Sequence, residues 1–419
     1  MKNLSFGYFL RFYLWLSKKC EWVWEKILHK RLAQGKETPS SLWQKWGGNN
    51  QCRPSGLLIW GHAVGVGEAM ALTGLLRRLS DQLPDAHFLI TTTARTSGEA
   101  LQTYGLPDRF MHQFAPIDTP RAVDAFLDHW QPSLAIWCEM DLWPTLITST
   151  YKKNIPCVLV NARLTKKSTN KRTWAKYLYR DVLSCFQTIW VQNLETKDCL
   201  LLLNAIEQRI QITGTLKALS PPLLSNKSIL NEWKKSLHHR LIWLLASSHF
   251  EDEKVAVKAH QQLLKNHPTA LLIIAPRERL RGEEIFKAIG PKCQLRTQHT
   301  NPPLRDISIY IADTIGEMGL WFQLAPIALM GGSFAPVGGH NPYEPLALGC
   351  QVLHGPQVWN FSEAYEQLAS QGWVKPVADA TEISSCVEQA WSSSQHGSVK
   401  TLFTDQHALL VNELIAHLK

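Results

Sequence analysis

Residues 57–79, LLIWGHAVGVGEAMALTGLLRRL, join an apolar run, a turn with glycines and a helix-like pattern that begins near Glu68. An apolar run followed by a helix is the repeating unit of a parallel sheet that helices cover on both faces. Gly65 and Gly67 approximate the start of a dinucleotide-binding turn, but Met70 stands at the third glycine position. A phosphate here would also be repelled, because Glu68 already lies at the partly positive N-terminus of the helix.

The same helix end favours the ionised carboxylate of Glu68, which is the form that a general base needs. We therefore hypothesise that Glu68 removes a proton from an acceptor hydroxyl, with His62 and Gly67 of the same turn close to the acceptor. A structural alternative fits these residues equally well, because glutamate is common in the first turn of helices. In that alternative, Glu68 only caps the helix and His62 only stabilises the turn.

Apolar runs and helical stretches alternate in two series along the chain, which predicts an α/β fold with two doubly wound domains. A length of 419 residues allows two or three domains. Prolines and polar residues in 217–231, KALSPPLLSNKSILN, suggest the break. We expect an acceptor domain at 46–217, a linker at 218–231 and a donor domain at 232–419. Ligands bind beyond the carboxyl ends of such strands, so the two domains are expected to face each other across a cleft.

The first 45 residues are expected to form a membrane-associating helical segment. Positions 1–50 hold nine Lys or Arg against three Glu, interleaved with Phe, Tyr and Trp. Arg11 interrupts the apolar stretch, which is too short for a spanning helix of about 20 residues. The pattern predicts a helix that lies on an anionic membrane surface, and a signal peptide is less favoured because no small-residue cleavage site follows. The alternative is a helix that packs on its own domain.

Two glycine-containing stretches of the second half follow apolar runs. In residues 331–345, GGSFAPVGGHNPYEP, glycines allow backbone N–H groups to approach an anion. This anion site is expected to comprise Gly331, Gly332, Gly338 and Gly339, with Ser333 donating to a phosphate, Asn341 capping the next helix and Glu344 accepting from ribose hydroxyls. In residues 313–322, DTIGEMGLWF, a helix is expected to begin at Thr314, Gly316 and Glu317, with Met318 as an apolar wall for a base. A surface loop and a capped helix are the structural alternatives.

Charged residues also follow the apolar runs of the first half. In residues 138–144, CEMDLWP, Glu139 leaves a predicted buried strand. Residues 161–180 hold seven Lys or Arg and no acid, either as a solvated face or as a phosphate-binding stretch that includes Arg163, Lys166 and Lys167. Nucleic acid is less favoured, because few aromatic residues interleave and no known binding module surrounds them. Nine scattered cysteines without a CxxC pair indicate a reducing compartment and no metal site.

Seven stretches occur in order between residues 60 and 361: HAVGVGE, EMDLWP, NARL, GTLK, DTIGEM, GGSFAPVGGHNPYEP and GPQVWNF. In this combination the chain resembles the bacterial 3-deoxy-D-manno-octulosonic acid (Kdo) transferases of lipopolysaccharide assembly. The resemblance implies a GT-B-type glycosyltransferase of two Rossmann-like domains. It implies that Kdo moves with inversion from CMP-Kdo to the lipid A precursor (lipid IVA), without metal or cofactor, at the cytoplasmic face of the bacterial inner membrane.

The resemblance also implies roles for individual residues. Glu68 matches the family's catalytic base, Glu139 its second acidic residue and Lys217 the lysine of its motif in GTLK. We expect Lys217 and Arg277 to stabilise the departing phosphate. CMP binding falls on Thr314, Gly316, Met318, Asn341 and Glu344. The chain departs from the family pattern at several positions, most of them on the donor side: Gly65 replaces Ser near the base, Phe250 replaces Glu and Glu278 replaces His. The stretch GTLKAL also lacks the Phe-Asp that often follows the lysine. Two rival functions remain: a nucleotide-sugar epimerase of the same fold, and a non-catalytic protein that binds phosphate or nucleic acid.

Overall fold

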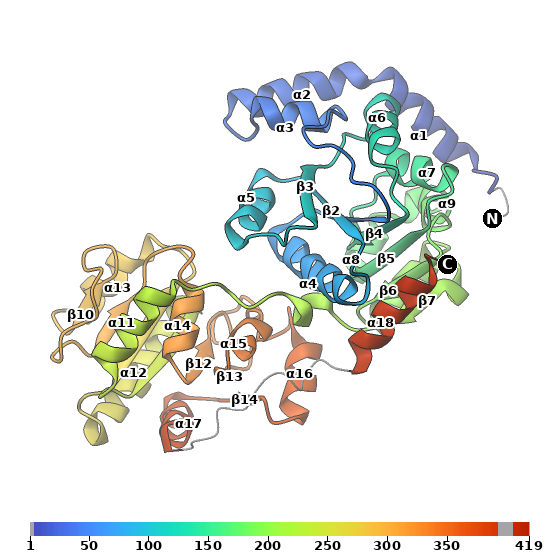
Figure 1. Ribbon diagram of the computed structural model, residues 1–419. Coiled ribbons are helices and arrows are strands. Elements are labelled where there is room, and N and C mark those ends of the chain that lie inside the picture. Colours follow the sequence, from blue (N-terminus) through green and yellow to red (C-terminus); the bar gives the residue numbers. More distant parts are fainter. Residues whose placement is uncertain (1–3, 393–404, 419) are drawn as a thin grey trace. The chain divides into compact units, whose positions relative to one another are not determined.

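The computed structural model describes residues 4–392 and 405–418, and these divide into two compact units (Figure 1). The first unit runs to Pro221 and takes in the last helix of the chain, and the second unit starts at Pro222. Each unit contains one seven-stranded sheet in which all paired strands are parallel. The predicted α/β architecture with two doubly wound sheets is therefore confirmed.

The sheet of the first unit has the strand order β3-β2-β1-β4-β5-β6-β7, so its order reverses between β1 and β4. Its strands are β1 (Leu58–Ala63), β2 (His87–Thr92), β3 (Phe110–Phe114), β4 (Leu134–Cys138), β5 (Cys157–Ala162), β6 (Thr188–Val191) and β7 (Ile210–Ile212). Its helices between strands are α4 (Val66–Gln82), α5 (Arg95–Tyr104), α6 (Pro120–Trp130), α7 (Pro144–Lys152), α8 (Lys166–Asn170), α9 (Lys176–Leu183) and α10 (Leu194–Leu202). The short helix η3 (Leu216–Leu219) follows β7.

The strands of this sheet are buried on both faces because successive side chains enter different cores. Trp60 of β1 packs with Phe126 of α6 on one face, whereas Ile59 packs with Leu72 of α4 on the other. This alternation follows from the two-residue period of a strand. Since ligands of such sheets bind where the strand order reverses, the loops after β1 and β4 lie at the expected site.

The second sheet has the order β10-β11-β9-β8-β12-β13-β14 and reverses between β8 and β12. Its strands are β8 (Ile242–Ser248), β9 (Leu271–Pro276), β10 (Cys293–Leu295), β11 (Ile309–Ile311), β12 (Ile327–Met330), β13 (Gln351–His354) and β14 (Val374–Pro376). Its helices are α11 (Lys227–Leu237), α12 (Phe250–Asn266), α13 (Arg281–Ile289), α14 (Met318–Leu324), α15 (Tyr343–Ala347), α16 (Ser362–Ser370) and α17 (Ala380–Ser392).

The last helix, α18 (Asp405–Ala416), belongs to the first unit. Its buried side chains Leu410, Val411 and Leu414 join the core that also contains Leu72 of α4. The sequence places residues 232–419 in one domain, and the structure differs because the apolar face of α18 is buried in the core of the first unit, where Leu410 and Leu72 are 338 positions apart. The division between the units at Pro221 and Pro222 lies inside the predicted linker, 218–231, but α11 already begins at Lys227.

The amino-terminal segment forms three helices that pack on the first unit: α1 (Tyr8–Lys19), α2 (Glu21–Ala33) and α3 (Pro39–Lys45). Leu10 of α1 is fully buried in the same core as Val123 of α6. The alternative that the amino-terminal segment packs on its own domain is therefore confirmed for the side chains on the inner face of these helices. None of the helices in residues 4–392 and 405–418 is both long and apolar enough to cross a membrane.

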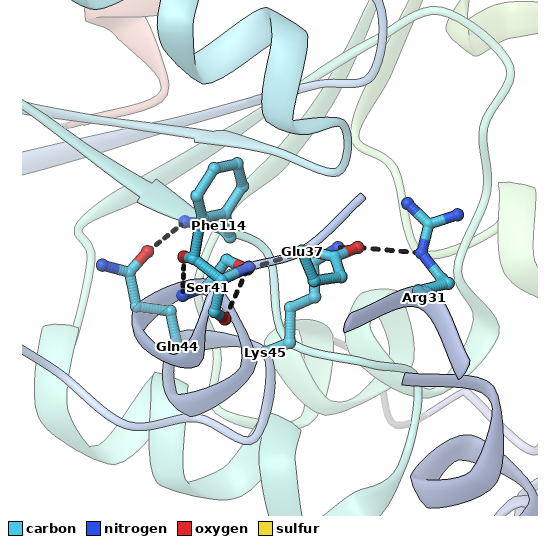
Figure 2. A network of polar contacts seen from close by, with 7 residues as sticks. Arg31, Glu37, Ser41, Gln44, Lys45 and Phe114 are labelled. Atoms are coloured by element: carbon cyan, nitrogen blue, oxygen red, sulfur yellow. Dashed lines mark hydrogen bonds and ion pairs between the residues drawn. The ribbon is translucent and has the colours of Figure 1, made fainter. Parts of the chain in front are cut away.

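A buried ion pair fixes the connection between α2 and α3 (Figure 2). Glu37 accepts hydrogen bonds from Arg31 (2.8 Å), Lys45 (2.5 Å) and Ser41 (2.8 Å). Burial opposes ionisation of Glu37, but these hydrogen bonds outweigh it and lower the pKa of the carboxyl. Gln44 accepts from the backbone N–H of Phe114 and thereby joins α3 to β3. The loss of one partner of a buried pair is strongly destabilising, so the network holds this segment in place.

Candidate active site

Glu68 lies in the first turn of α4, directly after the turn that leaves β1. Its carboxylate accepts a hydrogen bond from the backbone N–H of Gly65, so it caps the helix. A Cβ at position 65 would meet this carboxylate, so Gly65 permits the capped conformation. The side chain is partly exposed, and the neighbouring Gly67 has open space around its Cα. The cap predicted by the structural alternative is present, and it leaves the carboxylate within reach of a ligand.

Glu139 follows β4 and is held in an unusual backbone conformation. Its φ of 70° lies in the left-handed region, which costs a glutamate about 1–3 kcal/mol. Its N–H donates to the Val160 carbonyl (3.0 Å), and its Oε1 accepts from Asn161 Nδ2 (2.7 Å) and Gln192 Nε2 (3.0 Å). Such a conformation persists only where the surroundings hold it, so the structure aims this carboxylate in one direction.

The pKa of Glu139 is raised to about 7, first by burial and then by the like charge of Glu68. Lys217, Arg163 and the hydrogen bond from Gln192 act in the opposite direction. Glu68, Lys217 and Arg163 all act electrostatically on Glu139, so their charges lie near its carboxyl. A carboxyl whose pKa is raised by burial and by a neighbouring carboxylate is typical of active sites.

Asn161 joins three separate stretches of the chain at this site. Its Nδ2 donates to Glu139, and its Oδ1 accepts from the backbone N–H of Leu216 (2.9 Å) in η3 and from Gln192 Nε2 (3.1 Å). This bridge brings Lys217 of the GTLK stretch to the two carboxyls. Asn161 and Gln192 were not predicted as site residues from the sequence, although Asn161 lies near the end of β5 and Gln192 directly follows β6.

His62 does not line the site. Its side chain is fully buried, its Nδ1 pairs with Thr91 Oγ1 at 2.9 Å, and its ring packs against Trp137 with centroids 5.0 Å apart. Burial lowers its pKa to about 3, so the imidazole is neutral. The expectation that His62 meets the acceptor is wrong, and so is the alternative that it stabilises the turn: His62 is a core residue of β1 that pairs with β2. Arg163, Lys166 and Lys167 are exposed, and of these Arg163 acts on Glu139.

In the second unit, Asp252 organises the glycine loop of residues 331–345. Asp252 lies in the first turn of α12 with no exposed surface. Its Oδ2 accepts from the N–H groups of Gly332 (2.7 Å) and His249 (2.9 Å), and its Oδ1 from those of Phe334 (2.9 Å) and Ala335 (3.4 Å). Asp252 was not predicted as a site residue, because an acidic residue in the first turn of a helix is common in sequences without any further role.

The expected use of the loop's N–H groups for an anion needs correction. Three of them donate to Asp252, and those of Gly338 and Gly339 donate to the Gly332 carbonyl at 3.1 and 2.7 Å. The Ser333 hydroxyl is buried and donates to the Met330 carbonyl, so it is not free to donate to a phosphate. A Cβ at Gly331 would collide with the Ser247 carbonyl. These glycines thus serve close packing and positive φ within the loop.

Basic side chains lie at the carboxyl edge of the second sheet instead. His249 and His340 stack with ring centroids 5.6 Å apart and Nε2 atoms 3.4 Å apart. Burial, His249 and the exposed Arg277 lower the pKa of His340 to about 4. Asn341 accepts from the N–H of Tyr343 at 3.1 Å and donates to Glu344 at 3.2 Å. The N-cap residue of α15 is Pro342 rather than Asn341, so the predicted cap is corrected here. This edge can attract an anion through Arg277 and two imidazoles that an anion would make more basic.

The stretch DTIGEM forms a turn that an ion pair holds. Arg296 donates to both carboxylate oxygens of Glu317, at 3.0 and 2.7 Å, and the Thr314 hydroxyl donates to the same carboxylate. Glu317 is therefore engaged within the protein rather than directed at a ligand. Gly316, with φ of 88°, has open space around its Cα, and Met318 begins α14.

In residues 4–392 and 405–418 there is no group of three or more His, Cys, Asp or Glu side chains placed to hold a metal ion.

Comparison with known proteins identifies relatives that share one name. A family model described as 3-Deoxy-D-manno-octulosonic-acid transferase (kdotransferase) matches residues 28–220. The chain is 33% identical over 378 residues to a protein of Arabidopsis thaliana named probable 3-deoxy-D-manno-octulosonic acid transferase, mitochondrial, covering 87% of this chain and 84% of that protein. It is 32% identical over 368 residues to the 3-deoxy-D-manno-octulosonic acid transferase of Haemophilus influenzae, covering 83% and 82% respectively.

Solved structures share the architecture. UDP-GlcNAc 2-epimerase from Neisseria meningitidis, bound to UDP-GlcNAc, aligns with a TM-score of 0.55 and 13% identity over 86% of this chain and 100% of that one. A putative UDP-N-acetylglucosamine 2-epimerase from Listeria monocytogenes gives the same TM-score at 10% identity, over 86% and 95%. At these identities the likeness shows the fold alone.

The Glu68→Gln variant is expected to lower the pKa of Glu139 from about 7, because one cause of the raised value is the negative charge of Glu68. The measurement is a pH titration of 13C-labelled glutamate carboxyls by NMR. Glu99→Gln, at an exposed site on α5, is the matched control. An unchanged or higher pKa in Glu68→Gln would show that the two carboxyls do not interact.

The Asp252→Asn variant is expected to speed hydrogen exchange of the Gly332, Phe334 and Ala335 amides about tenfold, the equivalent of one weakened hydrogen bond to a charged group. Exchange is followed by mass spectrometry of peptides from the loop. Glu251→Gln changes the exposed neighbour on the same helix and should leave the loop as it is. Equal protection in both variants contradicts the role of Asp252.

Proposed function

This chain belongs to the 3-deoxy-D-manno-octulosonic acid (Kdo) transferase family, and we propose from that premise that it transfers Kdo from CMP-Kdo to a lipid A precursor with Glu68 as general base. The enzyme is a glycosyltransferase. The observation that carries the residue assignment is the carboxyl pair of Glu68 and Glu139 at the reversal point of the first sheet, with Lys217 acting on Glu139.

The donor is proposed to bind the carboxyl edge of the second sheet. CMP-Kdo carries negative charge on its phosphate and on its sugar carboxylate, and Arg277 is the cationic side chain at this edge, near the imidazoles of His249 and His340. Thr314, Gly316 and Met318 form the adjacent turn that we assign to the nucleotide, with Asn341 and Glu344 beyond it. The glycine loop contributes a fixed shape, because Asp252 and Gly332 already occupy its N–H groups.

The reaction is proposed as a direct displacement. Glu68 takes the proton of an acceptor hydroxyl, whose oxygen forms a bond to the anomeric carbon of Kdo as the bond from that carbon to the phosphate oxygen of CMP breaks. Attack from the side opposite CMP inverts the anomeric centre. Gly67 leaves open space beside the base. Lys217 is assigned to offset negative charge near Glu139, and Arg277 to hold the phosphate that departs.

The acceptor is proposed to be lipid IVA, presented by the cytoplasmic face of the bacterial inner membrane. Five aromatic side chains of α1 and α2 are at least half exposed, and we call them the aromatic face: Tyr8, Phe9, Phe12, Trp15 and Trp22. Phe9 stacks on Tyr177, with centroids 6.3 Å apart, and so joins this face to the basic stretch of residues 161–180. Aromatic rings beside cations are typical of helices that lie on anionic membranes. Arg163, Lys166 and Lys167 are assigned to the acceptor phosphates.

The Glu68→Gln variant is expected to lose about 100- to 10,000-fold in kcat, which is the usual contribution of a general base. Binding of CMP, measured by calorimetry, should remain as in the unaltered enzyme, because Glu68 lies in the first unit. The lipid product is measured by mass spectrometry after incubation with CMP-Kdo and lipid IVA, and Glu99→Gln serves as control. Near-normal turnover in Glu68→Gln rules out this base. Conversion of a nucleotide sugar without any acceptor would instead favour an epimerase.

Replacing Trp15 and Trp22 together by serine is expected to weaken binding to phosphatidylglycerol vesicles at least about tenfold, since both rings lose apolar contact with the membrane. Co-flotation with vesicles measures the effect. Leu202→Ser removes an exposed apolar side chain from α10, outside the aromatic face, and is the control. Equal binding by the double variant, or equal binding of the unaltered enzyme to uncharged phosphatidylcholine vesicles, contradicts this membrane assignment.

A further inference from the structure

A single buried carboxylate joins the amino-terminal helix α1 to the start of α7. The Tyr13 hydroxyl donates to Asp118 Oδ2 at 2.8 Å. The same carboxylate accepts from the backbone N–H of Thr145 at 3.0 Å and, through Oδ1, from that of Leu146 at 2.8 Å. Asp118 is only 1% exposed, so these three donors take the place of water. The first turn of α7 is therefore tied to α1.

A second set of contacts joins the amino-terminal helices to the loop that precedes α7. The ring of Trp24 in α2 packs against Trp143, with centroids 6.0 Å apart. Trp143 Nε1 in turn donates to Asp141 Oδ2 at 2.8 Å, and Trp137 Nε1 donates to the Asp141 carbonyl at 3.1 Å. Ser17 adds a hydroxyl contact of 3.2 Å to Thr145. Both α1 and α2 thus contact the end of the segment that begins with Glu139.

The start of this segment is held by the sheet, and its end by the amino-terminal helices. Glu139 has the left-handed φ of 70°, and its N–H is bonded to β5 through the Val160 carbonyl. A strained backbone of this kind relaxes when one end of its loop is released. Four residues separate Glu139 from Pro144, where α7 begins, so a shift of the helix start is passed to the carboxylate.

We propose that Tyr13, through Asp118, and Trp24, through Trp143, are positioning residues for Glu139. The proposal rests on the proposed function only in taking Glu139 as an active-site group. The amino-terminal helices then have two roles on opposite faces: the outer aromatic face contacts the membrane, and the inner face keeps Glu139 aligned with Asn161 and Gln192. Loss of the inner contacts loosens those two hydrogen bonds to the Glu139 carboxylate.

The first test is Tyr13→Phe, which removes one hydroxyl and keeps the ring. We expect kcat to fall about fivefold to tenfold, the equivalent of one lost hydrogen bond, while KM for CMP-Kdo stays unchanged. The limb of the pH profile that reports Glu139 should move to higher pH, because the Gln192 hydrogen bond that lowers its pKa is weakened. Tyr104→Phe removes a hydroxyl bonded to Arg77 elsewhere in the unit and is the matched control.

The second variant, Trp24→Leu, should also lower kcat while leaving binding to phosphatidylglycerol vesicles unchanged, because Trp24 faces Trp143 rather than the aromatic face. Trp43→Leu, at a 58% exposed position of α3, is its control and should retain full turnover. A loss of vesicle binding that accounts for the lost turnover in Trp24→Leu would overturn the positioning role.

Hydrogen exchange separates this proposal from the role assigned to Glu139. The amides of Thr145 and Leu146 should exchange several times faster in Tyr13→Phe than in Tyr104→Phe. Unchanged exchange, or faster exchange with unchanged kcat and pH profile, overturns the positioning of Glu139 by α1. Full turnover by Glu139→Gln, measured in parallel, would instead reject Glu139 as an active-site group.

Discussion

The amide of Asn161 is the contact on which the arrangement of the first unit's site depends. It donates to Glu139, at the end of β4, and accepts from the backbone of η3, which carries Lys217. Asn161 is 1% exposed and itself has a positive φ of 56°, a conformation that asparagine tolerates better than most residues. One side chain therefore brings a half-buried carboxyl and a lysine to the reversal point of the sheet.

The electrostatics of this site follow from that assembly. Burial and the neighbouring Glu68 carboxylate raise the pKa of Glu139, and Lys217 and Arg163 limit the rise to about 7. Glu68, at the positive end of α4 and partly exposed, has the opposite environment. The two glutamates thus differ in surroundings, because one follows a buried strand and the other caps a helix.

The second unit uses its polar groups differently. N–H groups of the glycine loop donate to Asp252 and to the Gly332 carbonyl, and the Glu317 carboxylate accepts from Arg296. The loops at this edge are therefore shaped before a ligand arrives, which lowers the entropy lost on binding. The cationic side chain at this edge is that of Arg277, which lies near the stacked imidazoles of His249 and His340.

The alternation of strands and helices, the two sheets, the helix end at Glu68 and the strand end at Glu139 could be predicted from the amino-acid sequence, because each depends on residues a few positions apart. The burial of His62, the return of α18 to the first unit and the internal bonding of the glycine loop could not, because they depend on packing between distant segments. Asn161 and Leu216 are 55 positions apart, and Asp252 and Gly332 are 80 apart. No local pattern encodes such pairs, since whole strands and helices must pack before a side chain can meet a backbone N–H so far away along the chain.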